Sequence, residues 1–474
     1  MKTITAVILF ISLFSISFTK SVSAEISKSK PLLTLTLRKA VQLALKRNPG
    51  IKGLENSLKI NQEKIGIAKS FLLPKIFVQE AGIGTNDPAY AFSLKLEQRR
   101  FSLSDLLGAP GTFNNPSPVS DFRTSLFLEE PIYMPTAKTE VKTADLMYQA
   151  QKENFYLDQQ KLAFQVIQTW LMIKTARDYV KTADKGVHDA EAHLKLAQKL
   201  YQSGIGLYSD TLRAFTAVKQ AEQKFIQAST RYQVSKLFLG YLLGINHPVQ
   251  ILIGRKGKSV FFHRHLKFYI HQWKKRDDLK SLLIQLSAAK KRIHLAQESY
   301  SPTLSFEGSY NLHDYRYPFG IEANDWEVML EANLNLFEGR RRREKLRIAR
   351  EQQKELQEQY IQFQNAVQLK VKKAYLEVKE AQKNVTLAEA AVKSSEEGVR
   401  LVQLRYQNSL SPFLDLLDAQ VSLDHSRSLL VSAKNQYLTA LYRFFYQTGN
   451  LLKIITLKAA TKGDDPEGEK KNGP

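Results

Sequence analysis

The sequence predicts a mainly α-helical protein with a small β part and a twofold internal repeat. Three observations lead to this fold class. Two long stretches have the apolar periodicity of a helix that turns and runs back on itself. Before each of them come stretches in which apolar and polar residues alternate, as in half-buried strands. The same order of elements occurs twice, and repeats of this kind usually stack into one continuous structure.

The clearer helical hairpin is predicted at about 339–448. Apolar residues along its first arm recur in steps of four and three, which is a heptad-type seam. No Gly or Pro lies between residues 339 and 398, so nothing forces a break. At 1.5 Å per residue the arm is roughly 100 Å long, and it needs neighbours along its whole length. The turn falls at 408–412, where Ser411 is the predicted N-cap of the returning helix.

The first repeat is predicted to span 25–244. Alternating patterns around Ile76, from Ala91 to Gln98, and around Leu126 indicate strands. A polar stretch rich in Gly, Pro and Asn at 108–120 has the composition of an exposed loop. In order, we predict helices at 35–47 and 56–72, a strand pair within about 75–132, and a helical hairpin at about 136–244.

The second repeat is predicted at 279–449. It has a helix, a strand pair at about 303–337, and then the hairpin described above. The two turns align, because Tyr201 to Gly204 falls on Tyr406 to Ser409. With the same offset, Asp210 falls on Asp415.

The two ends of the chain differ from the repeats. Residues 1–24 have a basic start, an apolar core and a small-residue cleavage site, which predicts a secretory signal peptide. An uncleaved anchor helix is the alternative, although the apolar core is short for a membrane span. Residues 450–474 form a polar tail that we expect to be disordered.

A basic segment at 245–278 connects the repeats. It contains His263, His265 and His271, and His is a common metal ligand. No carboxylate or cysteine stands at a recognisable ligand spacing, so we expect solvated polar surface there and no metal site.

Composition limits the functional classes. The chain of 474 residues has no cysteine, which excludes disulfides and a lipid-carrying cysteine. Its formal charge of +23 is compatible with nucleic acid, anionic lipid or an anionic solute as a partner, but export argues against nucleic acid. We find no nucleophile–base arrangement, phosphate loop or paired metal ligands, so we expect neither an enzyme nor a cofactor.

Four predicted strands per chain cannot close a barrel, and an open sheet edge cannot face lipid. Three chains together would supply about 12 strands, within the range of bacterial outer-membrane barrels. The helices would then form a hollow α-barrel below it. Apolar residues beside the main seam fit such two-sided packing, namely Ala366, Leu369, Leu376, Leu387 and Ala391. A periplasmic coiled-coil scaffold without a pore is the alternative, but it leaves the alternating segments unexplained.

The chain resembles the TolC-type outer-membrane factors, or outer membrane efflux proteins, over about residues 35–449. The resemblance rests on the repeat, the two turns and three short motifs at 37–49, 130–133 and 336–339. It implies a homotrimer in the outer membrane of a Gram-negative-type bacterium, with a long periplasmic extension. Its implied function is a passive exit duct of a tripartite efflux pump or type I secretion system. Docking of a periplasmic adaptor (membrane fusion) protein and an inner-membrane transporter would open the duct.

The resemblance also implies a gate near the second turn. Asp415 and Asp418 lie three residues apart, so they share a helix face, and the family places acidic residues there in a ring at the constriction. Asp415 could instead be an ordinary acidic residue at a helix start. Asp210 and Tyr406 match positions that the family uses as a latch, although they also fit a helix start and a seam. Ser411 replaces a basic residue of some members, which argues against a second, charge-based latch.

Two further surfaces are implied. The turns would meet the adaptor, through Gly204, Ile205, Gly206, Leu207, Ser409, Leu410, Ser411 and Pro412. In this architecture the run Arg340, Arg341, Arg342 and Arg343 falls just below the membrane, where arginines can contact lipid headgroups. A solvated, charge-rich helix start is the alternative for this run.

Overall fold

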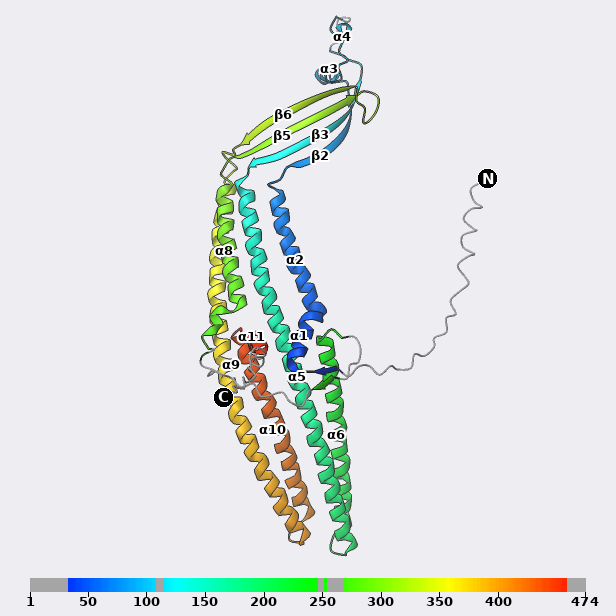
Figure 1. The fold of residues 1–474 in the computed structure, drawn as a ribbon, viewed down its shortest axis with the longest axis vertical. Coiled ribbons are helices and arrows are strands. Elements are labelled where there is room, and N and C mark those ends of the chain that lie inside the picture. Colours follow the sequence, from blue (N-terminus) through cyan, green and yellow to red (C-terminus); the bar gives the residue numbers. More distant parts are fainter. Residues whose placement is uncertain (1–32, 108–113, 246–250, 254–267, 269, 458–474) are drawn as a thin grey trace, which may run out of the picture.

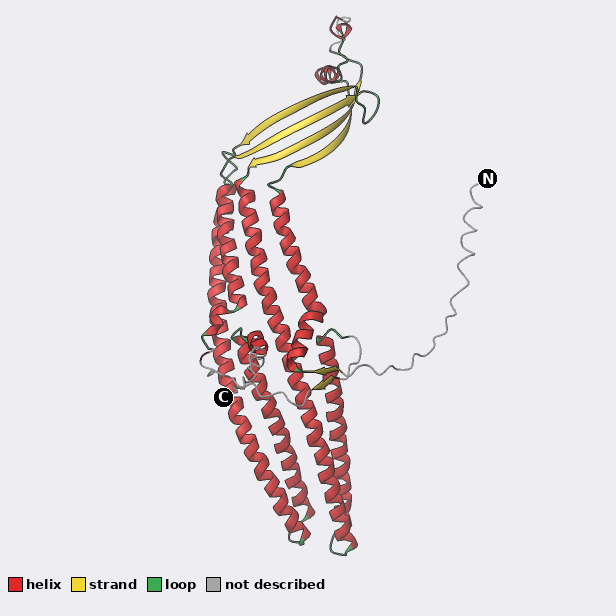
Figure 2. Ribbon diagram, in the orientation of Figure 1, coloured by secondary structure: helices red, strands yellow, loops and turns green. Residues whose placement is uncertain are grey.

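The computed structural model is a long rod of helices with a curved sheet at one end (Figure 1). A short pair of strands lies half-way along the rod (Figure 2). The structure describes residues 33–107, 114–245, 251–253, 268 and 270–457. Several predictions therefore fall outside the described residues: the signal peptide at 1–24, residues 108–113 of the exposed loop, His263, His265, and residues 458–474 of the tail.

Two helices extend from the sheet to the far tips of the rod, α5 (Pro135–Gln202) and α9 (Arg341–Gln407). Each is roughly 100 Å long at 1.5 Å per residue. α9 begins two residues later than predicted, because Gly339 and Arg340 both have positive φ angles, of 56° and 68°. Among the described residues, no helix combines the length and the apolar character that crossing a membrane requires.

Four shorter helices complete the rod. In the half next to the sheet, α2 (Pro49–Ser70) packs on α5, and α8 (Asp277–Glu298) contacts both α5 and α9. In the other half, α6 (Tyr208–Leu242) packs on α5, and α10 (Phe413–Gln447) contacts both α5 and α9. Each half is therefore a layer of four helices, with α9 at one edge and either α2 or α6 at the other.

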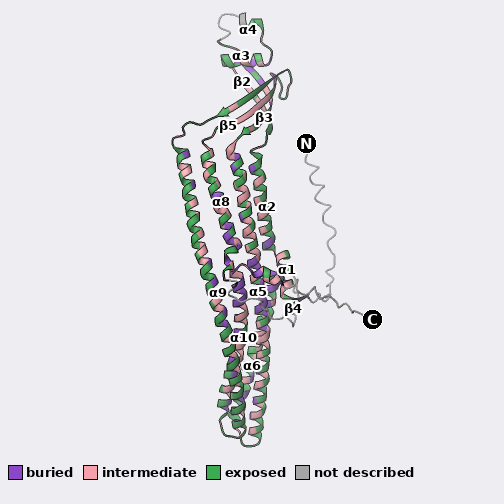
Figure 3. Ribbon diagram, turned by 60° about the vertical axis from the view of Figure 1, so that its left-hand side comes forward, coloured by how far each residue is buried: buried purple, intermediate pink, exposed green. Residues whose placement is uncertain are grey.

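The main core lies near the middle of the rod, where most buried residues gather (Figure 3). The predicted seam of α9 is buried there, including Val367, Val371 and Val378. It faces the same cluster as Phe444 of α10 and Ile167 of α5. Burying an apolar side chain of this size contributes about 1.5–3 kcal/mol, so this cluster holds the two repeats together.

Five short elements lie around the middle of the rod, namely β1 (Leu33–Leu35), α1 (Leu37–Arg47), β4 (Ile251–Ile253), η1 (Gln272–Lys275) and α11 (Leu451–Leu457). β1 and β4 pair in parallel. The expectation of a disordered tail from residue 450 is wrong for α11, because Leu451 is fully buried in the main core. Within the connecting segment, the structure describes the strand β4 and the short helix η1.

The sheet has four antiparallel strands in the order β2, β3, β5, β6. Their bounds are Lys75–Thr85, Val119–Tyr133, Thr303–Asp314 and Ala323–Asn333. The fold class predicted from the sequence is confirmed in this respect: the protein is mainly helical, with long helical hairpins and four antiparallel strands. β2 and β6 form the edges, and within the described residues each pairs on one side only.

The strand predicted from Ala91 to Gln98 is wrong. These residues lie in α3 (Pro88–Glu97), which is followed by the short helix α4 (Leu103–Leu107). Asp87 caps α3 by accepting a hydrogen bond from the backbone N–H of Tyr90, and Pro88 suits the first helical turn. Leu94 and Ala91 are then buried on the same face of the helix. Residues three apart share a face of a helix, whereas on a strand they point to opposite faces.

We expect Gly244→Ala to lower the free energy of unfolding by about 1–3 kcal/mol. Gly244 ends α6 with φ +65°, and an added Cβ would lie 2.7 Å from the carbonyl oxygen of Arg47. The measurement is thermal unfolding of the detergent-solubilised protein. Gly53→Ala is the control, since a Cβ at this helical position meets nothing within 4 Å and should be neutral or stabilising. Equal effects of the two substitutions would contradict the prediction.

Candidate functional site

The sheet has one apolar and one polar face, and the strand register assigns each residue to its face. Val78, Leu126, Tyr310 and Trp326 lie side by side across the four strands. On the other face, Gln79, Ser125, Asn311 and Asp325 do the same. Trp326 is 73% exposed, and such a large apolar side chain on a wide apolar face requires an apolar surrounding. A wall that is apolar on one side and polar on the other is typical of a membrane barrel.

The two helical hairpins end in different tips. In the first tip, Gly204 has φ +77°, and a Cβ on Gly206 would lie 2.8 Å from the backbone nitrogen of Tyr201. Only glycine therefore fits this turn without strain. Ile205 and Leu207 are exposed beside it.

The second tip reverses without glycine. Ser409 takes the positive φ of 56°, and Leu410 is exposed. The prediction of Ser411 as N-cap is wrong, because Pro412 occupies that position without a side-chain cap hydrogen bond. The helix begins one residue later so that Phe413 is buried against Tyr406, with the ring centroids 5.2 Å apart.

The predicted gate residues lie close to the second tip. Asp415 and Asp418 are both exposed, in the first two turns of α10. Their spacing of three residues brings the two carboxylates to one side of the helix. An exposed acidic pair at the lower end of the molecule can line a constriction only if further chains surround the same axis.

The predicted latch residues are both buried in the structure. Tyr406 belongs to the apolar cluster near the tips, and Asp210 lies in the first turn of α6. The phenol oxygen of Tyr406 is buried and makes no hydrogen bond. Burial, followed by the nearby negative charge of Asp210, raises the pKa of Tyr406 to about 12. The structure therefore brings the two residues close enough for Asp210 to act on the phenol.

A polar clamp between the two hairpins was not predicted from the sequence. Arg427 of α10 donates a hydrogen bond of 2.8 Å to Asp189 of α5, and lies 3.8 Å from Asp424. Gln420 donates to both of these carboxylates. Burial raises the pKa of Asp424, while Gln420 and Arg427 act in the opposite direction. Arg427 and Asp189 are far apart in the sequence, so no local spacing connects them.

The four arginines after the sheet have different surroundings. Arg341 pairs with Glu338, and Arg343 pairs with Glu344, both on the exposed surface. Arg342 is only 7% exposed, lies 5.0 Å from the ring of Tyr300, and donates to the backbone carbonyls of Ser299 and Asn335. The prediction of Arg342 as a lipid-headgroup residue is therefore wrong, since its guanidinium joins the strands to the helices.

A sheet with one apolar and one polar face, joined to two long helical hairpins that each end in a tight turn, is the architecture of a subunit of a membrane-spanning duct. The sequence profile of the family described as "Outer membrane efflux protein" matches residues 40–244 and 273–449. The chain therefore belongs to the outer membrane efflux protein family. Comparison with curated proteins gave no match.

Solved structures have the same fold. A membrane protein from Pseudomonas aeruginosa is 20% identical, with a TM-score of 0.74 over 87% of this chain and 93% of that chain. The CmeC outer membrane channel of Campylobacter jejuni is 16% identical, with a TM-score of 0.72 over 88% and 86%. The open state of the MtrE outer membrane channel of Neisseria gonorrhoeae is 18% identical, with a TM-score of 0.70 over 88% and 89%.

Family membership decides between the alternatives left open by the sequence. The protein is an outer-membrane efflux channel and not an enzyme, and its predicted outer-membrane localisation is confirmed. The alternative of a scaffold without a pore is thereby excluded. The twofold repeat is also confirmed, because the family profile matches the two halves separately.

We expect Arg427→Met to weaken the contact between the hairpins by about 2 kcal/mol, because Asp189 and Asp424 lose their cation. Hydrogen-exchange protection in the lower halves of α5 and α10 should fall by about 30-fold as a result. Arg400→Met is the control, since Arg400 forms an exposed pair with Glu397 that contributes less than about 0.5 kcal/mol. Unchanged protection in Arg427→Met would show that apolar packing alone holds the hairpins together.

Proposed function

We propose that three copies of the chain assemble into a passive exit duct with a shared β-barrel and a helical tunnel. The observation that carries the proposal is that the edge strands of the sheet and the edge helices of the rod coincide, so that each side of the subunit is one continuous edge. β2 follows α2 and lies at the same edge as α6, whereas β6 precedes α9. Each edge strand in lipid needs a partner for its backbone groups, and β6 of one copy can pair with β2 of the next. Three copies give about 12 strands.

Exposed apolar side chains on the edge helices support the same assembly. Leu369, Leu376 and Leu387 of α9 are each more than 60% exposed, and they form the second stripe seen in the sequence. At the opposite edge, α6 exposes Leu237 and Phe238. Covering both stripes with a neighbouring copy removes this apolar surface from water.

The orientation follows from the two ends of the molecule. The sheet spans the outer membrane, and the hairpins reach into the periplasm. Their tips meet a periplasmic adaptor protein, which links the duct to an inner-membrane transporter. The exposed apolar residues of the tips suit this role, and the proposed docking residues are Gly204, Ile205, Gly206, Leu207, Ser409, Leu410, Ser411 and Pro412.

The gate is proposed to lie at the same end. Asp415 and Asp418 from three copies would bring about six carboxylates around one axis, which attracts cations. Asp210 and Tyr406 would hold the two hairpins of one chain in the closed arrangement, since a phenol can donate a hydrogen bond to a carboxylate beside it. Arg340, Arg341 and Arg343, at the boundary between sheet and helices, would contact lipid headgroups.

The first test is single-channel conductance in a planar bilayer. Asp415→Ala combined with Asp418→Ala should abolish the cation preference of a small wild-type conductance, because the fixed negative charge at the constriction is lost. The matched control is Glu355→Ala with Glu358→Ala, an exposed acidic pair of the same spacing on α9, away from the tips. A conductance with unchanged selectivity would move the constriction elsewhere, and folded trimers without any conductance would overturn the duct.

The latch is tested separately. Tyr406→Phe should raise the closed-state conductance by about 2- to 10-fold, which corresponds to the loss of one hydrogen bond. Tyr201→Phe is the control, because Tyr201 occupies the corresponding position of the first hairpin but is 47% exposed. If the two variants conduct equally, Tyr406 is a packing residue and not a latch.

A further inference from the structure

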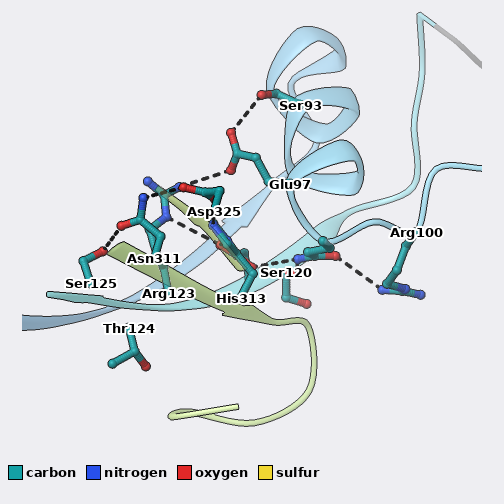
Figure 4. Close-up of polar contacts among 12 residues, drawn as sticks. Ser93, Glu97, Arg100, Ser120, Arg123, Thr124, Ser125, Asn311, His313 and Asp325 are labelled. Atoms are coloured by element: carbon teal, nitrogen blue, oxygen red, sulfur yellow. Dashed lines mark hydrogen bonds and ion pairs between the residues drawn. The ribbon is translucent and has the colours of Figure 1, made fainter. Parts of the chain in front are cut away.

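A buried cluster of ionisable side chains lies on the polar face of the sheet, at the end farthest from the helical rod and next to α3 (Figure 4). Asp121 and Arg123 come from β3, and His313 comes from β5 directly opposite Arg123. Glu97 reaches the same place from the end of α3. Asp121 is 0% exposed and His313 is 1% exposed, so both groups are inaccessible to bulk water.

Three of these residues have the arrangement of a metal-ligand set. One ligand atom each from Glu97, Asp121 and His313 lie within 4.8 Å of one another. One imidazole nitrogen and two carboxylate oxygens are donors that Zn²⁺ and similar first-row cations accept. Three protein ligands leave a fourth position for water or another small ligand.

A second shell of hydrogen bonds orients these donors. His313 Nε2 lies 2.8 Å from Asp325 Oδ2, and Asn311 donates to the other oxygen of Asp325 at 2.7 Å. A carboxylate on one ring nitrogen fixes the tautomer and makes the other nitrogen a better ligand. That other nitrogen, Nδ1, points at Asp121 Oδ2 at 2.9 Å. Gln98 donates to Asp121 Oδ1 at 2.9 Å, so Oδ2 is the oxygen left for a cation.

The charge in the cluster is incompletely balanced. The cluster holds three carboxylates, those of Glu97, Asp121 and Asp325, and the guanidinium of Arg123 pairs with two of them, Glu97 and Asp121. Arg123 stays 3.7 Å from both Glu97 and Asp121. Glu97 Oε2 and Arg123 Nε are both buried without a hydrogen bond. A divalent cation beside a neutral His313 would balance the two remaining charges and give Glu97 Oε2 a direct partner. The side chain of Arg123 is 29% exposed, so it has room to turn away.

We propose that Glu97, Asp121 and His313 form a binding site for a divalent first-row transition metal, which displaces Arg123 from between the carboxylates. The ligands come from three elements, so a bound metal would fasten α3 to β3 and β5. Leu94 of α3 already packs against Val119 on the polar face of the sheet. The placement of this face in the duct lumen rests on the proposed function, whereas metal binding rests on the single chain. In the duct, the metal would hold α3 across the outer mouth.

A proton on the imidazole of His313 competes with the metal for the ring nitrogen Nδ1. With both ring nitrogens protonated, His313 could bridge Asp121 and Asp325 with no metal bound. The test is therefore direct titration of Zn²⁺ into the chelator-treated full chain in detergent, followed by calorimetry. Co²⁺ absorption spectra provide a second readout, since they report the ligand geometry.

We expect the wild type to bind about one Zn²⁺ per chain in this site. His313→Ala should weaken binding by about 100-fold, and Asp325→Asn, which only orients His313, by about 10-fold. Glu97→Gln serves if His313→Ala fails to fold, because Glu97 is partly exposed at the end of a helix. His188→Ala is the matched control, since His188 is exposed on α5, and it should leave binding unchanged.

Two results would overturn the proposal. One is a wild type that binds no Zn²⁺, which would leave the proton as the occupant. The other is equal binding by wild type, His313→Ala and Glu97→Gln, which would place the metal on other histidines of the chain. Neither result bears on the exit duct, whose test is the conductance of the Asp415 and Asp418 variants.

Discussion

The backbone groups along the outer sides of β2 and β6 impose the main constraint on this molecule. In lipid they cannot turn to water, so each edge needs another strand. The same two edges continue down the rod, because α2 connects directly to β2 and β6 connects to α9. A neighbour that satisfies the sheet therefore also lies beside the exposed apolar stripes of the edge helices. The need to pair the backbone groups of the two edge strands thus also fixes which helices of neighbouring copies lie side by side along the rod.

The sequence predicted the long elements well, because their signals are repeated many times. The seam of α9 recurs over many turns, so one exposed or polar position does not change the assignment. α3 shows the opposite case, since ten residues with several apolar side chains fit both an alternating and a helical pattern. The deciding signal was local: Asp87 and Pro88 form a helix start, and Leu94 needs burial on the same face as Ala91.

The repeat marks the positions of Asp210 and Tyr406 beside the two turns, and the structure places both there, whereas their role as a latch stays a prediction. The candidate site was not predictable where contacts join distant segments. Arg427 and Asp189 meet only because α5 and α10 pack side by side. The arginine run shows a further limit, since successive residues on a helix point about 100° apart. Identical neighbours such as Arg341 and Arg342 therefore meet different surroundings, and composition alone cannot distinguish them.

The charge of the whole chain is also a poor guide to the interior of the duct. The sequence carries +23, which suggests anionic cargo if that charge lines the lumen. The register argues otherwise for the barrel, because its polar face carries Glu129, Glu307, Glu327 and Glu331. Lys75 opposes only one of them, at 3.5 Å from Glu129. In the proposed duct the excess of basic residues therefore lies on other surfaces, and a cargo that passes the barrel would meet an acidic wall before it leaves.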